Sequence, residues 1–198
     1  MGKQEWYRTI TPTTKPTVVI IYGGWHVPES HEKLITALQK AGCETRPPTA
    51  DLYNTSDLIR SYISSLMRAG RTVVAIMHYG GQVRSNSLVG LCLGTRASQG
   101  LRGGVSHLIY MAAFAVPEGT AMMGKVKEFG HMNLVPLARS TTAACREIPV
   151  AYIRCTADMT VPLDYQNSFT FDLATGHCPN LTAVDGVVDA LNKIVGTK

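Results

Sequence analysis

The sequence has none of the segments that mark a membrane-spanning or a repeat protein. No stretch approaches the 18 or more consecutive apolar residues that a transmembrane helix needs. The first residues, 1–15, are polar and do not have the pattern of a signal peptide. No internal repeat or low-complexity segment is visible. We therefore expect a cytoplasmic protein with no membrane partner.

Cysteine motifs and clusters of basic residues are also missing. The 5 cysteines are an odd number without C-x-x-C spacing, which signals neither a disulfide framework nor a zinc site. We expect no metal and no other cofactor. The net charge of +5 comes from Lys and Arg residues that are scattered rather than gathered in a run, so we expect no nucleic-acid partner. A small-molecule partner is the remaining expectation.

The chain does have the size and the pattern of one globular α/β domain. Its 198 residues are enough for a single domain with a substantial core, and 45% of them are hydrophobic. From Pro16 onward, short apolar runs rich in β-branched residues alternate with amphipathic stretches. This alternation predicts a largely parallel sheet with helices on both faces.

The boundaries of the predicted elements follow from apolar periodicity and from glycines that stop helices. Gly42 and Gly70 are two such stop signals. A further helix is predicted after the turn at Gly80 and Gly81, and it carries the apolar residues Val83, Leu88, Leu91 and Leu93. The other predicted elements are strands at 17–22, 43–46, 72–77, 107–114, 149–155 and 169–173, and helices at 32–41, 56–69 and 187–195.

Five short blocks of sequence, in this order along the chain, resemble the α/β hydrolases, and in particular compact fungal members associated with secondary-metabolite genes. The blocks are Gly23-Gly24-Trp25-His26, His78-Tyr79-Gly80-Gly81-Gln82-Val83, Gly103-Gly104-Val105, Asp158-Met159-Thr160-Val161-Pro162-Leu163 and Thr175-Gly176-His177-Cys178-Pro179-Asn180. The resemblance covers nearly the whole chain. It implies an α/β-hydrolase fold as one domain, 1–198, with a reduced cap at 116–148.

The resemblance also implies roles for individual residues. Asp158 matches the acid of the catalytic triad, and His177 matches its general base, which the carboxylate orients. The backbone amides of Gly24 and Gly80 match the oxyanion hole. Trp25 and His26 would line the substrate pocket. The plainer alternative is that the acid only forms a turn, the histidine only approaches a helix, and the glycines only form tight turns.

The chain departs from the family at the nucleophile turn. Relatives read His-Ser-Tyr-Gly-Gly, whereas this chain reads Met77-His78-Tyr79-Gly80-Gly81 and has no serine there. A one-residue gap can stand for the serine, or Tyr79 can occupy the nucleophile position. Tyr79 is a poor acyl acceptor but can donate a proton. Ser85, Ser87 and Cys178 are weaker candidates for a nucleophile.

Two further departures are a cap shortened to 116–148 and a link between Cys155 and Phe169, residues 156–168, that barely meets the minimum length for a parallel crossover. A parallel crossover usually needs a dozen or more residues, so we expect the last strand to be held loosely.

Three hypotheses stay open. The first is an ester or thioester hydrolase descendant with weak or absent hydrolysis, acting on a polyketide-like intermediate through Asp158 and His177. The second is a lyase, isomerase or cyclase that uses His177 as base and Tyr79 as acid. The third is an inactive homologue or a binding module.

Overall fold

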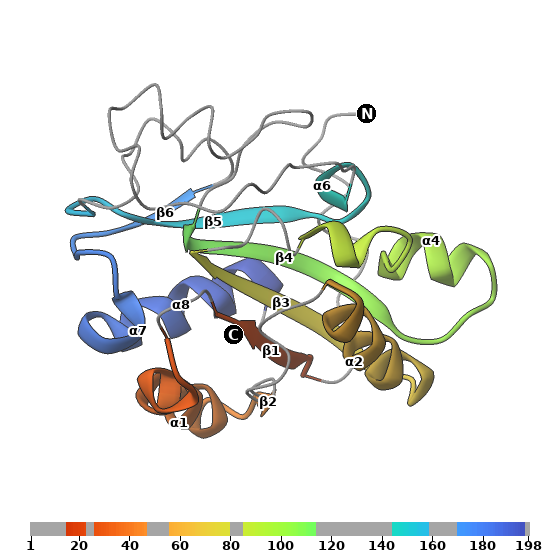
Figure 1. Ribbon diagram of the computed structural model, residues 1–198, viewed down its shortest axis with the longest axis horizontal. Helices are drawn as coiled ribbons and strands as arrows, with labels where there is room; N and C mark the ends of the chain where they lie inside the picture. The colour runs from red at the N-terminus through yellow and green to blue at the C-terminus, as the bar shows by residue number, and fades with distance from the viewer. Residues whose placement is uncertain are drawn as a thin grey trace.

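The computed structural model describes residues 15–22, 26–46, 56–79, 85–113, 144–158 and 170–196, which form one six-stranded sheet with helices around it (Figure 1). The strand order is β2-β1-β3-β4-β5-β6, and every pair of neighbours is parallel. The strands are β1 (Thr17–Ile21), β2 (Glu44–Arg46), β3 (Thr72–Tyr79), β4 (Gly104–Ala113), β5 (Val150–Cys155) and β6 (Thr170–Leu173). The predicted parallel α/β fold is confirmed.

The helices divide between the two faces of the sheet (Figure 1). They are η2 (Pro28–His31), α1 (Glu32–Lys40), α2 (Ser56–Arg68), η4 (Asn86–Leu88), α4 (Leu93–Ser98), α6 (Ala144–Glu147), α7 (Pro179–Thr182) and α8 (Val184–Val195). Leu34 and Leu38 of α1 pack with Leu191 of α8 on one face. Ile59 and Ile63 of α2 pack on the other.

Side chains alternate between these two faces along β3. Val74 and Ile76 belong to the core that α1 and α8 cover, while Ala75 and Met77 belong to the core that α2 covers. The same alternation directs His78 toward the α1 and α8 face. The carboxyl ends of the parallel strands meet at one edge of the sheet, where sites form in open α/β folds.

The end of β4, beside the end of β3, has an irregular backbone. The pairing shifts so that His78 lies opposite Met111 and Tyr79 lies opposite Ala113, which leaves Ala112 as an extra residue with a φ of 44°. The hydroxyl of Tyr152, on β5, accepts a hydrogen bond of 3.0 Å from the Ala113 N–H and donates one to the Ala113 carbonyl. This contact stabilises the strained turn.

The region between β3 and β5 differs from the sequence prediction. The prediction of one helix after Gly81 is wrong, because η4 and α4 are separate helices and Gly90, with a φ of +74°, turns the chain between them. The predicted cap, 116–148, lies outside the described residues except for α6 and Ile148. None of the helices in the described ranges is long and apolar enough to cross a membrane.

Candidate active site

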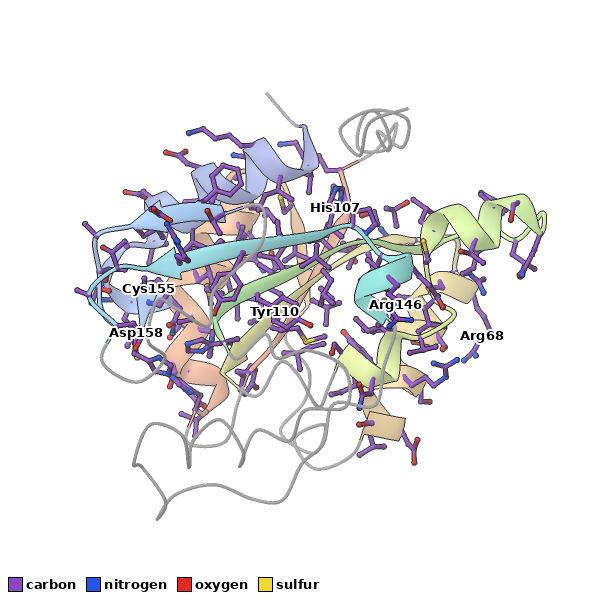
Figure 2. The ribbon with its side chains drawn as sticks, turned by 90° about the horizontal axis from the view of Figure 1, so that it is seen from above. Arg68, His107, Tyr110, Arg146, Cys155 and Asp158 are labelled. Carbon is purple, nitrogen blue, oxygen red and sulfur yellow. The ribbon has the colours of Figure 1, made fainter. Side chains whose placement is uncertain are left out.

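The turn that carries Asp158 is held against the turn that carries His177 by backbone hydrogen bonds. Thr156 N–H donates to the carbonyl of Leu173 at 2.9 Å, and Ala157 N–H donates to the carbonyl of Thr175 at 3.1 Å. Asp158 N–H closes its own turn on the carbonyl of Cys155 at 3.1 Å. Cys155 and Asp158 lie together at the carboxyl end of β5 (Figure 2). The two turns therefore form one structural unit.

Asp158 and His177 are in direct contact within this unit. The Nδ1–H of His177 donates to Oδ2 of Asp158 over 2.9 Å. The Asp158 side chain is 0% exposed and that of His177 is 19% exposed. A carboxylate that accepts from Nδ1–H leaves Nε2 of the imidazole as the nitrogen that can take a proton. The pair has the geometry of an oriented general base.

A surface ion pair fixes β6, the strand that leads to His177. Arg154 on β5 and Asp172 on β6 lie directly opposite each other in the parallel register. Arg154 Nε lies 2.6 Å from Oδ1 of Asp172, and Nη2 lies 2.5 Å from Oδ2. The guanidinium lowers the pKa of the Asp172 carboxyl. The expectation of a loosely held last strand is therefore not met, because β6 pairs with β5 at four positions.

The short helix after His177 is anchored to the segment before α1. Asn180 donates from Nδ2 to the carbonyl of Ser30 at 2.7 Å, and Asn180 is fully buried. Thr182 donates from Oγ1 to the carbonyl of Cys178 at 2.9 Å, which closes the first turn of α7. The turn that bears the base is thus held from both sides, by β5 and by η2.

Three other histidines gather beside this turn: His26, His31 and His78. Their ring centroids lie 4.6 Å apart for His26 and His78, 5.4 Å for His26 and His31, and 5.6 Å for His31 and His78. The His78 and His177 centroids lie 5.4 Å apart. His31 also stacks on Tyr22, with centroids at 4.8 Å. In the described part of the chain, no group of three or more His, Cys, Asp or Glu side chains could hold a metal ion.

Burial keeps two of these imidazoles neutral. His31 is fully buried, and desolvation, reinforced by neighbouring His26, lowers its pKa to about 4. His78 is also fully buried, and desolvation followed by His26 lowers its pKa well below the usual value. Nε2 of His78 lies 3.2 Å from the backbone carbonyl of His177. The ring beside the proposed base is therefore an uncharged hydrogen-bond donor.

The structure describes some of the other predicted site residues fully, one of them only in its backbone, and the rest not at all. His26 is half-buried, with Nε2 3.9 Å from Sγ of Cys178. Tyr79 is the last residue of β3, where its backbone is described and its side chain is not. Gly24, Trp25 and Gly80, predicted for the oxyanion hole and the pocket, lie outside the described residues.

The weaker nucleophile candidates lie in environments that do not favour them. Ser85 and Ser87 are buried, and the carbonyl of Ser87 accepts a hydrogen bond of 2.9 Å from Arg60 of α2, on the α2 face of the sheet. Burial, followed by the charge of Asp158, raises the pKa of the Cys178 thiol. A raised pKa lowers the thiolate fraction, so Cys178 is not an activated nucleophile.

The sequence interpretation missed His78 and His31 as parts of the site. His78 lies in one of the five resemblance blocks, but the resemblance implies roles only for Tyr79 and Gly80 in that block. A histidine that directly follows an apolar strand was the available signal, because a polar residue at a strand's carboxyl end faces the edge where sites form. For His31 the sequence holds no comparable signal.

The chain resembles known proteins over nearly its whole length. It is 25% identical to the α/β hydrolase nvfD from Aspergillus novofumigatus, in an alignment that covers 92% of this chain and 97% of the relative. That alignment extends over 245 residues, so the relative contains segments that this chain of 198 residues lacks. No family model matches the chain.

Solved structures share the fold at low sequence identity. An extracellular α/β-hydrolase from a Paenibacillus species has a TM-score of 0.62 at 14% identity, covering 90% of this chain and 98% of its own. Tomato methylketone synthase I, complexed with 2-tridecanone, has a TM-score of 0.68 at 9% identity, covering 92% and 98%.

The parallel sheet, the order of its strands and these likenesses define an α/β-hydrolase fold. The chain therefore has the fold of the α/β hydrolases, and its sequence is similar to that of the Aspergillus protein.

Proposed function

We propose that this protein is an enzyme of ester or thioester hydrolase descent, in which His177 acts directly as a general base on a small carbonyl substrate. The observation that carries the proposal is the 2.9 Å bond from His177 Nδ1 to the buried Asp158 carboxylate. The carboxylate fixes the tautomer of the imidazole and stabilises the imidazolium that forms when Nε2 takes a proton. The similarity to a fungal protein named as an α/β hydrolase supports the hydrolase descent. A small polyketide-like molecule is the proposed substrate.

Without a serine, the hydrolytic step runs through water. Nε2 of His177 takes a proton from a water molecule as the water oxygen bonds to the acyl carbon. The negative charge that develops on the carbonyl oxygen is stabilised by backbone amides, for which Gly24 and Gly80 are the candidates. The imidazolium then returns the proton to the departing alcohol or thiol. Because the covalent route is absent, this hydrolysis is slow.

A second candidate is proton-transfer chemistry without hydrolysis, by a lyase, isomerase or cyclase. Tyr79 directly follows His78, which bonds to the backbone of the His177 turn. The backbone of β3 therefore places Tyr79 at the same edge of the sheet as the proposed base. The likeness to a methylketone synthase shows that this fold carries enzymes other than those named hydrolases. An inactive or binding homologue is the third outcome. The cytoplasmic location and the absence of nucleic-acid and membrane partners stay predictions.

Turnover of p-nitrophenyl butyrate and an N-acetylcysteamine thioester by purified protein tests the proposal. We expect His177→Ala and Asp158→Asn to lower kcat by about 100-fold or more, since general-base catalysis is worth about 10²–10⁴-fold. His107→Ala is the matched control, because His107 is a buried histidine on β4, away from Asp158 (Figure 2). A fluorophosphonate probe should not label the protein.

The pattern across variants separates the candidates. Loss with His177→Ala but not with Tyr79→Phe favours water activation. Loss with both variants, on a polyketide-like substrate, favours proton-transfer chemistry. A wild type that turns over neither ester nor polyketide-like substrate above the His177→Ala background contradicts the proposal and favours the binding homologue. Fluorophosphonate labelling that disappears with Ser85→Ala or Ser87→Ala would show that a serine nucleophile is present after all.

A further inference from the structure

The hydrogen bond between His78 and His177 connects two parts of the fold that the sheet itself keeps apart. β3 and β6 are not neighbours, because β4 and β5 lie between them. Three strand spacings separate them by about 14 Å. The turn after β6 reaches back across the strand ends, so that the His177 carbonyl lies 3.2 Å from Nε2 of His78. This contact holds the backbone of His177, the proposed base, close to the end of β3.

The chemistry of this contact fixes which form of His78 is present. A carbonyl oxygen only accepts hydrogen bonds, so Nε2 of His78 must carry the proton. The ring is fully buried and cannot rotate freely, because His26 and His31 pack against it at centroid distances of 4.6 Å and 5.6 Å. A fixed donor on a rigid strand end is therefore aimed at the backbone of the residue that carries the proposed base.

The contacts of the His177 turn show what this donor adds. Backbone bonds from Thr156 and Ala157 hold the side of the turn that faces β5. The Asn180 bond to Ser30 holds the following helix. The bond from His78 joins the His177 peptide itself to the end of β3. Loss of that donor would let the His177 peptide shift relative to β3 while its side chain stays paired with Asp158.

We propose that His78 is a positioning residue, which holds the proposed base at its working distance from the end of β3 by donating Nε2–H to the His177 carbonyl. This inference rests on the proposed role of His177. Misplacement of a catalytic group by about 1 Å can cost about 100-fold in rate. A loss of that size in kcat, with KM little changed, is the effect expected when the donor is removed.

The test compares side chains that keep or remove the donor. His78→Leu removes it, whereas His78→Gln keeps an N–H at about the place of Nε2. We expect His78→Leu to lower kcat by about 10- to 100-fold with KM within about twofold. His78→Gln should recover kcat to within about fivefold of wild type. His107→Leu, at a second buried histidine on β4, should leave kcat within about twofold.

A spectroscopic measurement makes the result independent of turnover. In protein labelled with ¹⁵N-histidine, the ring resonances of His177 report its bond to Asp158 and its surroundings. They should shift in His78→Leu and return toward wild type in His78→Gln. If wild type has no activity, the proposed function fails, and these resonances alone decide whether His78 positions His177.

Three results would overturn the inference. The first is a His78→Leu variant with wild-type kcat and unshifted His177 resonances. The second is a His78→Gln variant no better than His78→Leu, which would mean that packing and not the donor matters. The third is a further loss of activity when His78→Leu is added to His177→Ala, because a residue that acts only through His177 has no effect once that imidazole is gone. Should His78→Leu not fold, His78→Asn, whose shorter amide cannot reach the carbonyl, replaces it.

Discussion

The two halves of the candidate site differ in whether they hold the side chains that catalysis would need. The acid–base half, formed by the turns after β5 and β6, has a buried carboxylate, an oriented imidazole and backbone bonds between the turns. The elbow half, at the end of β3, reads His78-Tyr79-Gly80 and has no hydroxymethyl side chain to serve as an acyl acceptor. The difference shows that the pairing of His177 with Asp158 does not depend on the serine nucleophile that His177 would activate in relatives.

The physical reason is that the acid–base half is held by contacts within its own strands. Leu173 and Thr175 accept backbone bonds from the Asp158 turn, and Arg154 pairs with Asp172 in register. None of these contacts involves β3. His78 connects the elbow half to the His177 turn through a bond to a backbone carbonyl rather than to the imidazole. A change at the elbow can therefore remove the nucleophile without dismantling the dyad.

Restoring a serine at the elbow should change the activity more than any other variant. One variant inserts Ser between His78 and Tyr79 and so recreates the order His-Ser-Tyr-Gly-Gly, and Tyr79→Ser tests the alignment without a gap. If the dyad is correctly placed, one of the two should gain fluorophosphonate labelling and raise kcat/KM on p-nitrophenyl butyrate by at least about tenfold. Labelling should disappear when His177→Ala is added.

Matched controls make that gain interpretable. An inserted Ala in place of the inserted Ser, and Tyr79→Ala in place of Tyr79→Ser, change the backbone and the volume equally without supplying a hydroxyl. A gain seen with the alanine controls would point to altered access rather than to a nucleophile. No labelling in either serine variant, with both folded, would mean that the acid–base half does not face the elbow closely enough to activate it.

Much of the architecture was predictable because local signals and tertiary contacts agree. Gly42 and Gly70 adopt φ values of +82° and +77° directly after the helices they were predicted to end. Asp158 and His177 were identified from their order along the chain and from their positions after strands. Each of these inferences needed only a pattern within one segment or one resemblance block.

The remaining features depend on contacts that no local pattern records. His26 and His31 come from the segment before η2 and from η2, and His78 comes from the end of β3, so only the folded chain brings the three rings together. The break at Gly90 splits a stretch whose apolar spacing suits one helix. The apolar period predicted that helix, and the tertiary structure replaced it with η4 and α4.

Acid should lower the free energy of unfolding through His31, which packs against His78 of the elbow half. The pKa of His31 is lowered by burial to about 4 in the folded protein, against about 6.5 when unfolded. Between these values the unfolded chain binds more protons, so the free energy of unfolding falls as pH decreases from about 6.5 to about 4. His31 contributes up to about 1.4 kcal/mol per pH unit to this slope.

Urea unfolding of wild type and His31→Phe at pH 7, 5.5 and 4.5 measures this contribution. The variant should lose less stability on acidification than wild type does, because phenylalanine binds no proton. His107→Phe is the matched control outside the site, since burial also lowers the pKa of His107 to about 4. It should flatten the slope by a similar amount and leave kcat unchanged. Equal slopes in wild type and His31→Phe would contradict a neutral buried His31.

The smallest expected effect comes from the surface ion pair that holds β6. Asp172→Asn removes the charge that Arg154 pairs with, and exposed pairs of this kind contribute little to overall stability. Because β6 leads directly to His177, we expect kcat to fall about two- to fivefold with almost no change in Tm. Glu44→Gln is the control, since Glu44 pairs with Arg71 at the opposite edge strand, β2. Equal effects of the two variants on kcat would show that the pair contributes only surface charge and does not position the base.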